Sequence, residues 1–110
     1  MEREKFNKII EYLEQVLKYP AMHFGAIAAV ESANGYLIGI RYATFFLFDL
    51  DNYSIVSFMR EATTRRNHKF TPRGAIRDLK DEGYEDTQIV IKLVEIEIDF
   101  WKLVRDSLYK

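Results

Sequence analysis

The stretch D-T-Q-I-V-I-K-L-V-E-I-E-I-D-F-W-K-L-V-R-D-S-L, residues 86–108, decides between an all-helical fold and one that contains a sheet. Its centre, V-E-I-E-I-D-F at residues 94–100, alternates apolar and acidic side chains, as a strand does. Over the whole stretch, however, polar residues recur in steps of three and four and mark one side of a helix: Gln88, Lys92, Glu95, Asp99, Lys102 and Asp106. Because this pattern covers the entire stretch, we predict a helix over residues 86–108.

One acidic residue of this expected helix does not belong to the polar stripe. Glu97 lies on the opposite side, among Val90, Val94, Trp101 and Val104. Burying a carboxylate without a partner is costly. Glu97 is therefore expected to pair with an internal arginine such as Arg41 or Arg77, or with a tyrosine hydroxyl, unless that side of the helix faces a partner protein.

Three more helices are predicted from apolar spacing and from residues that start or stop a helix. The first has apolar residues at helical spacing and ends before Pro20: Phe6, Ile9, Ile10, Leu13, Val16 and Leu17. The third is capped by Asp51 or Asn52 and runs to about residue 66, with Ile55, Met59 and Ala62 on its inner side. The fourth begins with Thr71 as N-cap and Pro72 as first helical residue, and Gly83 ends it.

The second helix, expected over residues 26–47, carries a stripe of small residues: Ala28, Ser32, Gly35, Gly39 and Ala43. Two interior glycines weaken an isolated helix by about 1 kcal/mol each relative to alanine, so some contact is expected to compensate for them. We expect either another helix of the chain packed closely in this groove or a homodimer seam. If the groove is internal, Gly39→Leu should destabilise the protein by overpacking it.

These segments predict an all-α fold: a single compact domain, residues 1–110, of about five helices with the small-residue-rich second helix at its centre. The chain has no cysteine, which excludes disulfides and thiolate metal sites and is typical of a cytoplasmic protein. Its charged N-terminus does not resemble a signal peptide. Residues 26–48 are apolar, but Glu31, Asn34 and Arg41 would each cost about 2–3 kcal/mol or more within a bilayer, so no membrane contact is expected.

The sequence contains no motif of an enzyme class. It has no glycine-rich phosphate loop, no dinucleotide fingerprint, no H-E-x-x-H and no G-x-S-x-G. His23 and His68 are far apart and lack the spacing of metal ligands. We therefore expect no catalytic residue, no metal and no cofactor, and we predict a protein that is not an enzyme.

Charge is unevenly distributed along the chain. Residues 60–80 carry seven Lys or Arg and two acids, whereas residues 81–99 carry seven acids and Lys92. In the basic segment from Arg60 to Arg73, phosphates could be contacted by Arg65, Arg66, Lys69 and Arg73, with Phe70 as a stacking surface. The isoelectric point near 6.1 is unlike that of a typical nucleic-acid-binding protein, so helix-end cations are the favoured interpretation.

A resemblance to a family adds a functional expectation. The residues that carry it are Pro20, Met22, Gly25, Gly35 and Tyr36 together with residues 89–108. They resemble small all-helical bacterial proteins with a P-x-M-Y-x-G-like turn, some of which are similar to immunity proteins of polymorphic toxin systems. In the turn itself, Pro20 ends the first helix, Met22 and Phe24 can pack inward, and Gly25 allows the chain to reverse.

The resemblance implies a non-enzymatic protein that neutralises a cognate bacterial toxin by direct binding. If the toxin is a basic nuclease, an acidic surface is its natural complement, since opposed potentials speed encounter. The partner-binding residues predicted on this basis are Asp81, Glu82, Glu85, Asp86, Glu95 and Asp99. The alternative is a small regulatory adaptor or nucleic-acid-associated protein that uses the basic segment.

Overall fold

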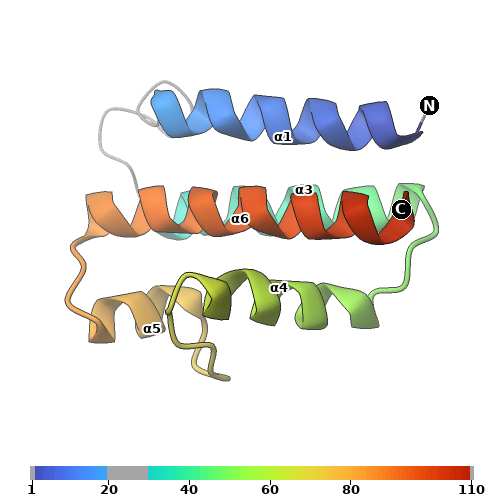
Figure 1. The fold of residues 1–110 in the computed structure, drawn as a ribbon. Helices are drawn as coiled ribbons and strands as arrows, with labels where there is room; N and C mark the ends of the chain where they lie inside the picture. The colour runs from blue at the N-terminus through green and yellow to red at the C-terminus, as the bar shows by residue number, and fades with distance from the viewer. Residues whose placement is uncertain (1, 20–29, 110) are drawn as a thin grey trace.

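Residues 2–19 and 30–109, which the computed structural model describes, form five helices and no strand. The helices are α1 (Glu2–Lys18), α3 (Val30–Leu47), α4 (Tyr53–Arg65), α5 (Ala75–Asp81) and α6 (Asp86–Leu108). Figure 1 shows them in layers, with α1 on one side of α6, α4 and α5 on the other, and α3 behind α6. The predicted all-α class is confirmed, and so is the helical reading of residues 86–108. The predicted turn at residues 20–25 lies outside the described residues.

The centre of the bundle is α6, because it packs against each of the other four described helices. The prediction that the second helix lies at the centre is wrong. Ten residues of α6 are buried: Ile89, Val90, Leu93, Val94, Ile96, Glu97, Ile98, Phe100, Trp101 and Val104. A helix covered on several sides needs apolar residues around most of its circumference. The strand-like alternation at residues 94–100 is a consequence of that central position.

An aromatic cluster fills the core where α1, α3 and α6 meet. Trp101 is fully buried, and its ring centroid lies 5.9 Å from that of Phe6, 6.0 Å from that of Phe45 and 5.1 Å from that of Phe100. Aromatic pairs at such separations add roughly 0.5–1.5 kcal/mol each beyond their buried area. The cluster therefore joins three helices, through Phe6 of α1, Phe45 of α3, and Phe100 and Trp101 of α6.

Polar contacts connect the start of α1 to the end of α6, which run in opposite directions (Figure 1). The Arg3 guanidinium donates to the carbonyl oxygen of Tyr109 at 2.8 Å, and Arg105 donates to the Asn7 side-chain oxygen at 3.0 Å. These contacts lie at the same end of the bundle as the junction between α3 and α4.

The predicted starts of the third and fourth helices have different outcomes. At α4 the Asp51 carboxylate accepts a hydrogen bond from the Tyr53 backbone N–H at 2.9 Å. The predicted start is confirmed, since α4 begins at Tyr53, directly after Asp51 and Asn52. α5 begins later than predicted, because Gly74 has φ +98°, outside the helical region, and the helix can start only at the next residue. Thr71 is therefore not a helix cap, and Pro72 is not in the helix. The predicted stop is confirmed, since Gly83 has φ +97°.

The small-residue stripe on α3 does not pack against another described helix. Ser32, Gly35, Gly39 and Ala43 are all exposed. Apart from the adjacent residues and the helix's own backbone, no described atom lies within 4 Å of a Cβ built on either glycine. Ala28 lies outside the described part of the chain. The expectation of an internal groove, and of overpacking by Gly39→Leu, is wrong for this reason.

We expect Gly39→Ala to raise the free energy of unfolding by up to about 1 kcal/mol, because an exposed mid-helix glycine costs conformational entropy that alanine does not. Urea denaturation of both proteins measures the change. Gly83→Ala is the matched control, and it should lower the free energy of unfolding because Gly83 has φ +97°. A loss of stability in Gly39→Ala would contradict an open face on α3.

Among the described residues, no helix has both the length and the apolar composition needed to cross a lipid bilayer.

Candidate protein-binding surfaces

The basic and acidic segments, which follow each other in sequence, form ion pairs with each other in space. Arg66 on the α4 side contacts two carboxylates of α6, that of Asp99 at 2.6 Å and that of Glu95 at 3.6 Å. Arg73 contacts Asp81 at 2.6 Å. The charge asymmetry along the chain is thus largely neutralised in the fold.

The connection between α4 and α5 is anchored by two acidic residues of the α5 region. Asp78 is buried and accepts hydrogen bonds from the backbone N–H of Thr71 at 2.9 Å and from the Thr71 hydroxyl at 2.6 Å. Glu82 lies 2.9 Å from the His68 ring nitrogen and 3.3 Å from the Lys69 backbone nitrogen. Part of the basic segment is therefore a connection held in place by carboxylates.

Four of the six predicted partner-binding residues lie together where α5 leads into α6, and we name these four the acidic turn: Asp81, Glu82, Glu85 and Asp86. The Asp86 side chain is 67% exposed, and its nearest ion-pair partner, Lys80, is 4.0 Å away. Glu85 caps α6, and its backbone N–H donates to the Gln88 side chain at 3.0 Å. The other two predicted residues, Glu95 and Asp99, lie along α6 and are joined by Arg66.

The buried carboxylate of Glu97 has an arginine partner inside the bundle, as one of the sequence alternatives expected. Arg41 Nε on α3 lies 3.0 Å from both carboxylate oxygens, and Trp101 Nε1 donates to one of them at 3.1 Å. Burial raises the pKa of Glu97 above its ordinary value, and Arg41 and Trp101 oppose that shift. The alternatives in which Glu97 pairs with Arg77 or faces a partner protein are excluded.

Tyr36, one of the residues of the family resemblance, connects α3 to α1. Its hydroxyl forms a hydrogen bond with the hydroxyl of Tyr12. Burial and this hydrogen bond raise the pKa of Tyr36 to about 12. The phenol therefore stays protonated at physiological pH.

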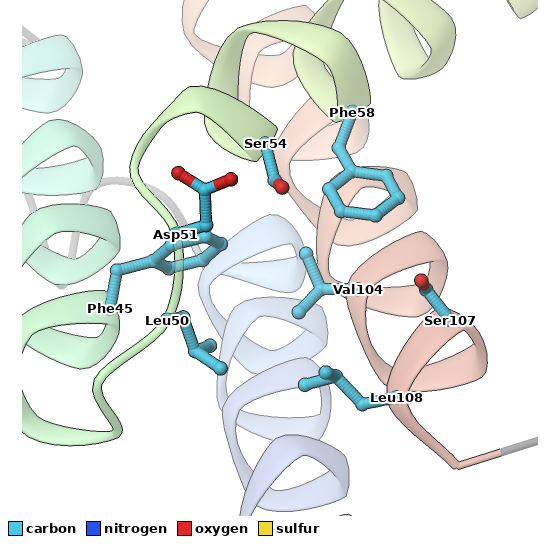
Figure 2. Close-up of a pocket in the computed structure, with 8 residues that line it drawn as sticks. All are labelled: Phe45, Leu50, Asp51, Ser54, Phe58, Val104, Ser107 and Leu108. Atoms are coloured by element: carbon cyan, nitrogen blue, oxygen red, sulfur yellow. The ribbon is translucent and has the colours of Figure 1, made fainter.

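A pocket of about 150 Å³ lies between the end of α3, the start of α4 and the last turns of α6 (Figure 2). Its apolar lining comes from all of these elements: Phe45, Leu50, Phe58, Val104 and Leu108. Three polar side chains complete it: Asp51, Ser54 and Ser107. The pocket is thus mainly apolar, with one carboxylate.

Large apolar side chains are exposed at the same end of the bundle as this pocket. Phe46 is 81% exposed, Leu47 76% and Tyr53 89%, and Leu108 is half-exposed. We name these four residues the apolar end. Clustered exposed apolar side chains on a folded chain are typical of interaction sites.

Sequence reasoning only partly identified this region. In the sequence, the aromatic run Phe45, Phe46 and Phe48 indicates a second interface, and the structure separates the three. Phe45 is buried beneath the pocket, Phe46 is exposed, and the Phe48 ring lies 5.6 Å from that of Phe6. At Asp51 the sequence predicts only a helix cap, and the residue also has that role.

Within residues 2–19 and 30–109 the structure brings together no group of three or more metal-ligating side chains. Of the two histidines considered as ligands, His68 pairs with Glu82, and His23 is outside the described residues.

Comparison of the chain with protein-family models, with curated proteins and with solved structures yields no significant match in any of the three.

Proposed function

We propose that this chain is a non-enzymatic binding protein that neutralises a cognate bacterial toxin by direct contact, as immunity proteins do. The observation that supports binding is the apolar end, where Phe46 and Tyr53 are almost fully exposed. Their sequence neighbours Phe45 and Ser54 line the pocket. The buried centres of protein interfaces are enriched in aromatic residues, and anchors that fill pockets contribute most of the affinity. A monomeric protein gains nothing in stability from exposing such side chains.

The acidic turn and the apolar end lie at opposite ends of α6, which has 23 residues and is therefore about 34 Å long. The apolar end would form the desolvated centre of the interface with the toxin. The acidic turn would attract a basic toxin during encounter, since charges at the edge of an interface act mainly on association.

The identification with an immunity protein, in contrast to binding in general, rests on the resemblance in Pro20, Met22, Gly25, Gly35, Tyr36 and residues 89–108. A basic nuclease acting in the cytoplasm is the toxin that best matches the acidic residues, and the absence of cysteine agrees with that compartment.

Two substitutions should separate the role of the acidic turn in association from the role of the apolar end in the bound complex. The measurement is stopped-flow kinetics with the toxin domain. Asp86→Lys should slow association several-fold at low salt and leave dissociation nearly unchanged, because Asp86 is exposed and weakly paired. Phe46→Ala should instead speed dissociation, by about thirtyfold if it is a hot spot worth about 2 kcal/mol. Equal effects of both substitutions on dissociation alone would contradict this division of roles.

A combined charge reversal of Glu82, Glu85 and Asp86 is not suitable for the same test. Glu82 contacts His68 and the Lys69 backbone, so its reversal would disturb the connection between α4 and α5. Glu85 caps α6.

The adaptor or nucleic-acid alternative has less support, because Arg65, Arg66 and Arg73 each contact a carboxylate at 2.6 Å. Phosphate would have to compete with these pairs. Retention on mixed-sequence DNA or RNA at low salt that is lost in Arg65→Glu with Arg66→Glu would favour this alternative.

A homodimer is a further candidate, supported by the outer face of α3. This face is exposed and carries no charge along Gly35, Ile38, Gly39, Tyr42 and Ala43, because Arg41 is directed to Glu97. Sedimentation equilibrium tests it, since a dimer through this face should dissociate in Gly39→Leu.

A further inference from the structure

The pocket beside the apolar end has the size of a single side chain. An apolar cavity of about 150 Å³ can hold a molecule of the size of benzene, and this pocket has that volume. Its walls come from three helices and the connection between α3 and α4, so the pocket depends on the assembled bundle. Burying one Leu, Met or Phe side chain there would strengthen binding by roughly ten- to a hundredfold.

The charge at the pocket is negative and not neutralised within the described residues. One Asp51 oxygen accepts the Tyr53 N–H, and the other has no hydrogen-bond or ion-pair partner in the described part of the chain. Asp49, in the same connection, is exposed and likewise forms no ion pair with a described residue. Within residues 2–19 and 30–109, no lysine or arginine lines the pocket. These two aspartates differ from Asp81 and Asp99, whose charges are paired with arginine.

Figure 2 shows how the two kinds of side chain are arranged. Asp51 and Ser54 lie on one side of the pocket, and Leu50 and Leu108 lie on the opposite side. An occupant that fills the apolar part therefore has a carboxylate and a hydroxyl along one flank. A cation carried next to the apolar group would be placed favourably beside Asp51.

We propose that this pocket receives one Leu, Met or Phe side chain from a segment of the partner protein in which a Lys or Arg is adjacent, so that the cation meets the Asp51 carboxylate. This inference rests on the proposed function and specifies its recognition chemistry. The occupant is a basic protein segment with an apolar anchor.

The test is an NMR titration of the ¹⁵N-labelled full chain with three capped tripeptides, Lys-Phe-Lys, Glu-Phe-Glu and Lys-Ala-Lys. Lys-Phe-Lys should shift the amide signals of Ser54, Val104 and Leu108. Lys-Ala-Lys should bind more than about tenfold more weakly, because it lacks the ring that fills the pocket. Glu-Phe-Glu should be weaker as well. Equal affinity for the Lys-flanked and Glu-flanked peptides, or no shift of these signals, would overturn the proposal.

Variants assign the binding to this pocket. Asp51→Asn should weaken Lys-Phe-Lys about two- to fivefold, as expected for the loss of one exposed charge pair. Glu11→Gln, which neutralises an exposed carboxylate on α1, should have no effect. Ser107→Phe should abolish binding by occupying the pocket, and unchanged affinity in this variant would overturn the proposal.

The titration uses no toxin, so its outcome is separate from that of the proposed function. Peptide binding without protection against any toxin would leave the pocket proposal standing and count against the immunity function. If the wild-type chain binds none of the peptides and the Ser107→Phe variant still protects cells, the pocket proposal alone would be overturned.

Discussion

Arg41→Met should lower the free energy of unfolding by about 3–5 kcal/mol, the usual cost of removing one partner of a buried ion pair. Glu97 is fully buried, and the Arg41 side chain is only 11% exposed. Without the guanidinium, the carboxylate retains only the Trp101 N–H as a donor among the described contacts. Chemical denaturation followed by circular dichroism at pH 7 measures the loss.

The loss in Arg41→Met should depend on pH. The folded-state pKa of Glu97 is already raised by burial, and the variant removes the main group that opposes this shift. A raised carboxyl pKa stabilises the folded state below the unfolded value of about 4.3, and this contribution disappears as pH rises through the folded value. The difference between variant and wild type should therefore be smaller at pH 4 than at pH 7.

The control keeps the shape of the Glu97 side chain and removes its charge. Adding Glu97→Gln to Arg41→Met should recover most of the stability, because the amide oxygen introduced at this position would still accept the Trp101 hydrogen bond without a buried charge. A double variant as unstable as Arg41→Met would show that packing of the guanidinium, and not the charge on Glu97, is responsible.

Trp101→Ala should cost about 3–5 kcal/mol or prevent folding, since it leaves a large cavity at the centre of the bundle. Trp101 is fully buried, and its ring packs against those of Phe6, Phe45 and Phe100. The substitution also removes the hydrogen bond to Glu97. Because the chain has a single tryptophan, circular dichroism and not fluorescence must follow unfolding.

Trp101→Phe separates the contribution of ring packing from that of the hydrogen bond to Glu97, because it keeps an aromatic ring and removes the N–H. It should cost less than the alanine variant, and its cost should shrink at low pH, where Glu97 is protonated. A cost independent of pH would show that the hydrogen bond to Glu97 contributes little.

The parts of the fold that sequence could predict depend on local chemistry. The polar stripe from Gln88 to Asp106 identified α6, and Gly83 identified the end of α5, because both signals act within a few residues. The partner of Glu97 could be narrowed to a few candidates, since burial of a carboxylate restricts them strongly.

The parts that could not be predicted depend on which helix packs where. The small residues Gly35 and Gly39 indicate that a neighbour packs closely there, but not whether this neighbour belongs to the same chain. Among the described residues, no side chain covers them. The start of α5 could not be predicted because it depends on the positive φ of Gly74, in a turn that a hydrogen bond between Thr71 and Asp78 spans.

The candidate site was partly missed for a similar reason. Counting charges along the chain indicates two segments of opposite sign, but only the fold reveals that Arg66 and Arg73 neutralise acids of the other segment. The pocket joins Phe45 to Ser107, residues more than sixty positions apart, so no local pattern marks it.

The most direct test of the proposed function is co-expression of the chain with each toxin domain encoded next to its gene. The proposal predicts that one toxin is neutralised, that it forms a stoichiometric complex with the purified chain, and that Phe46→Ala weakens protection more than Asp86→Lys does. Growth arrest by every such toxin in the presence of the wild-type chain would contradict it.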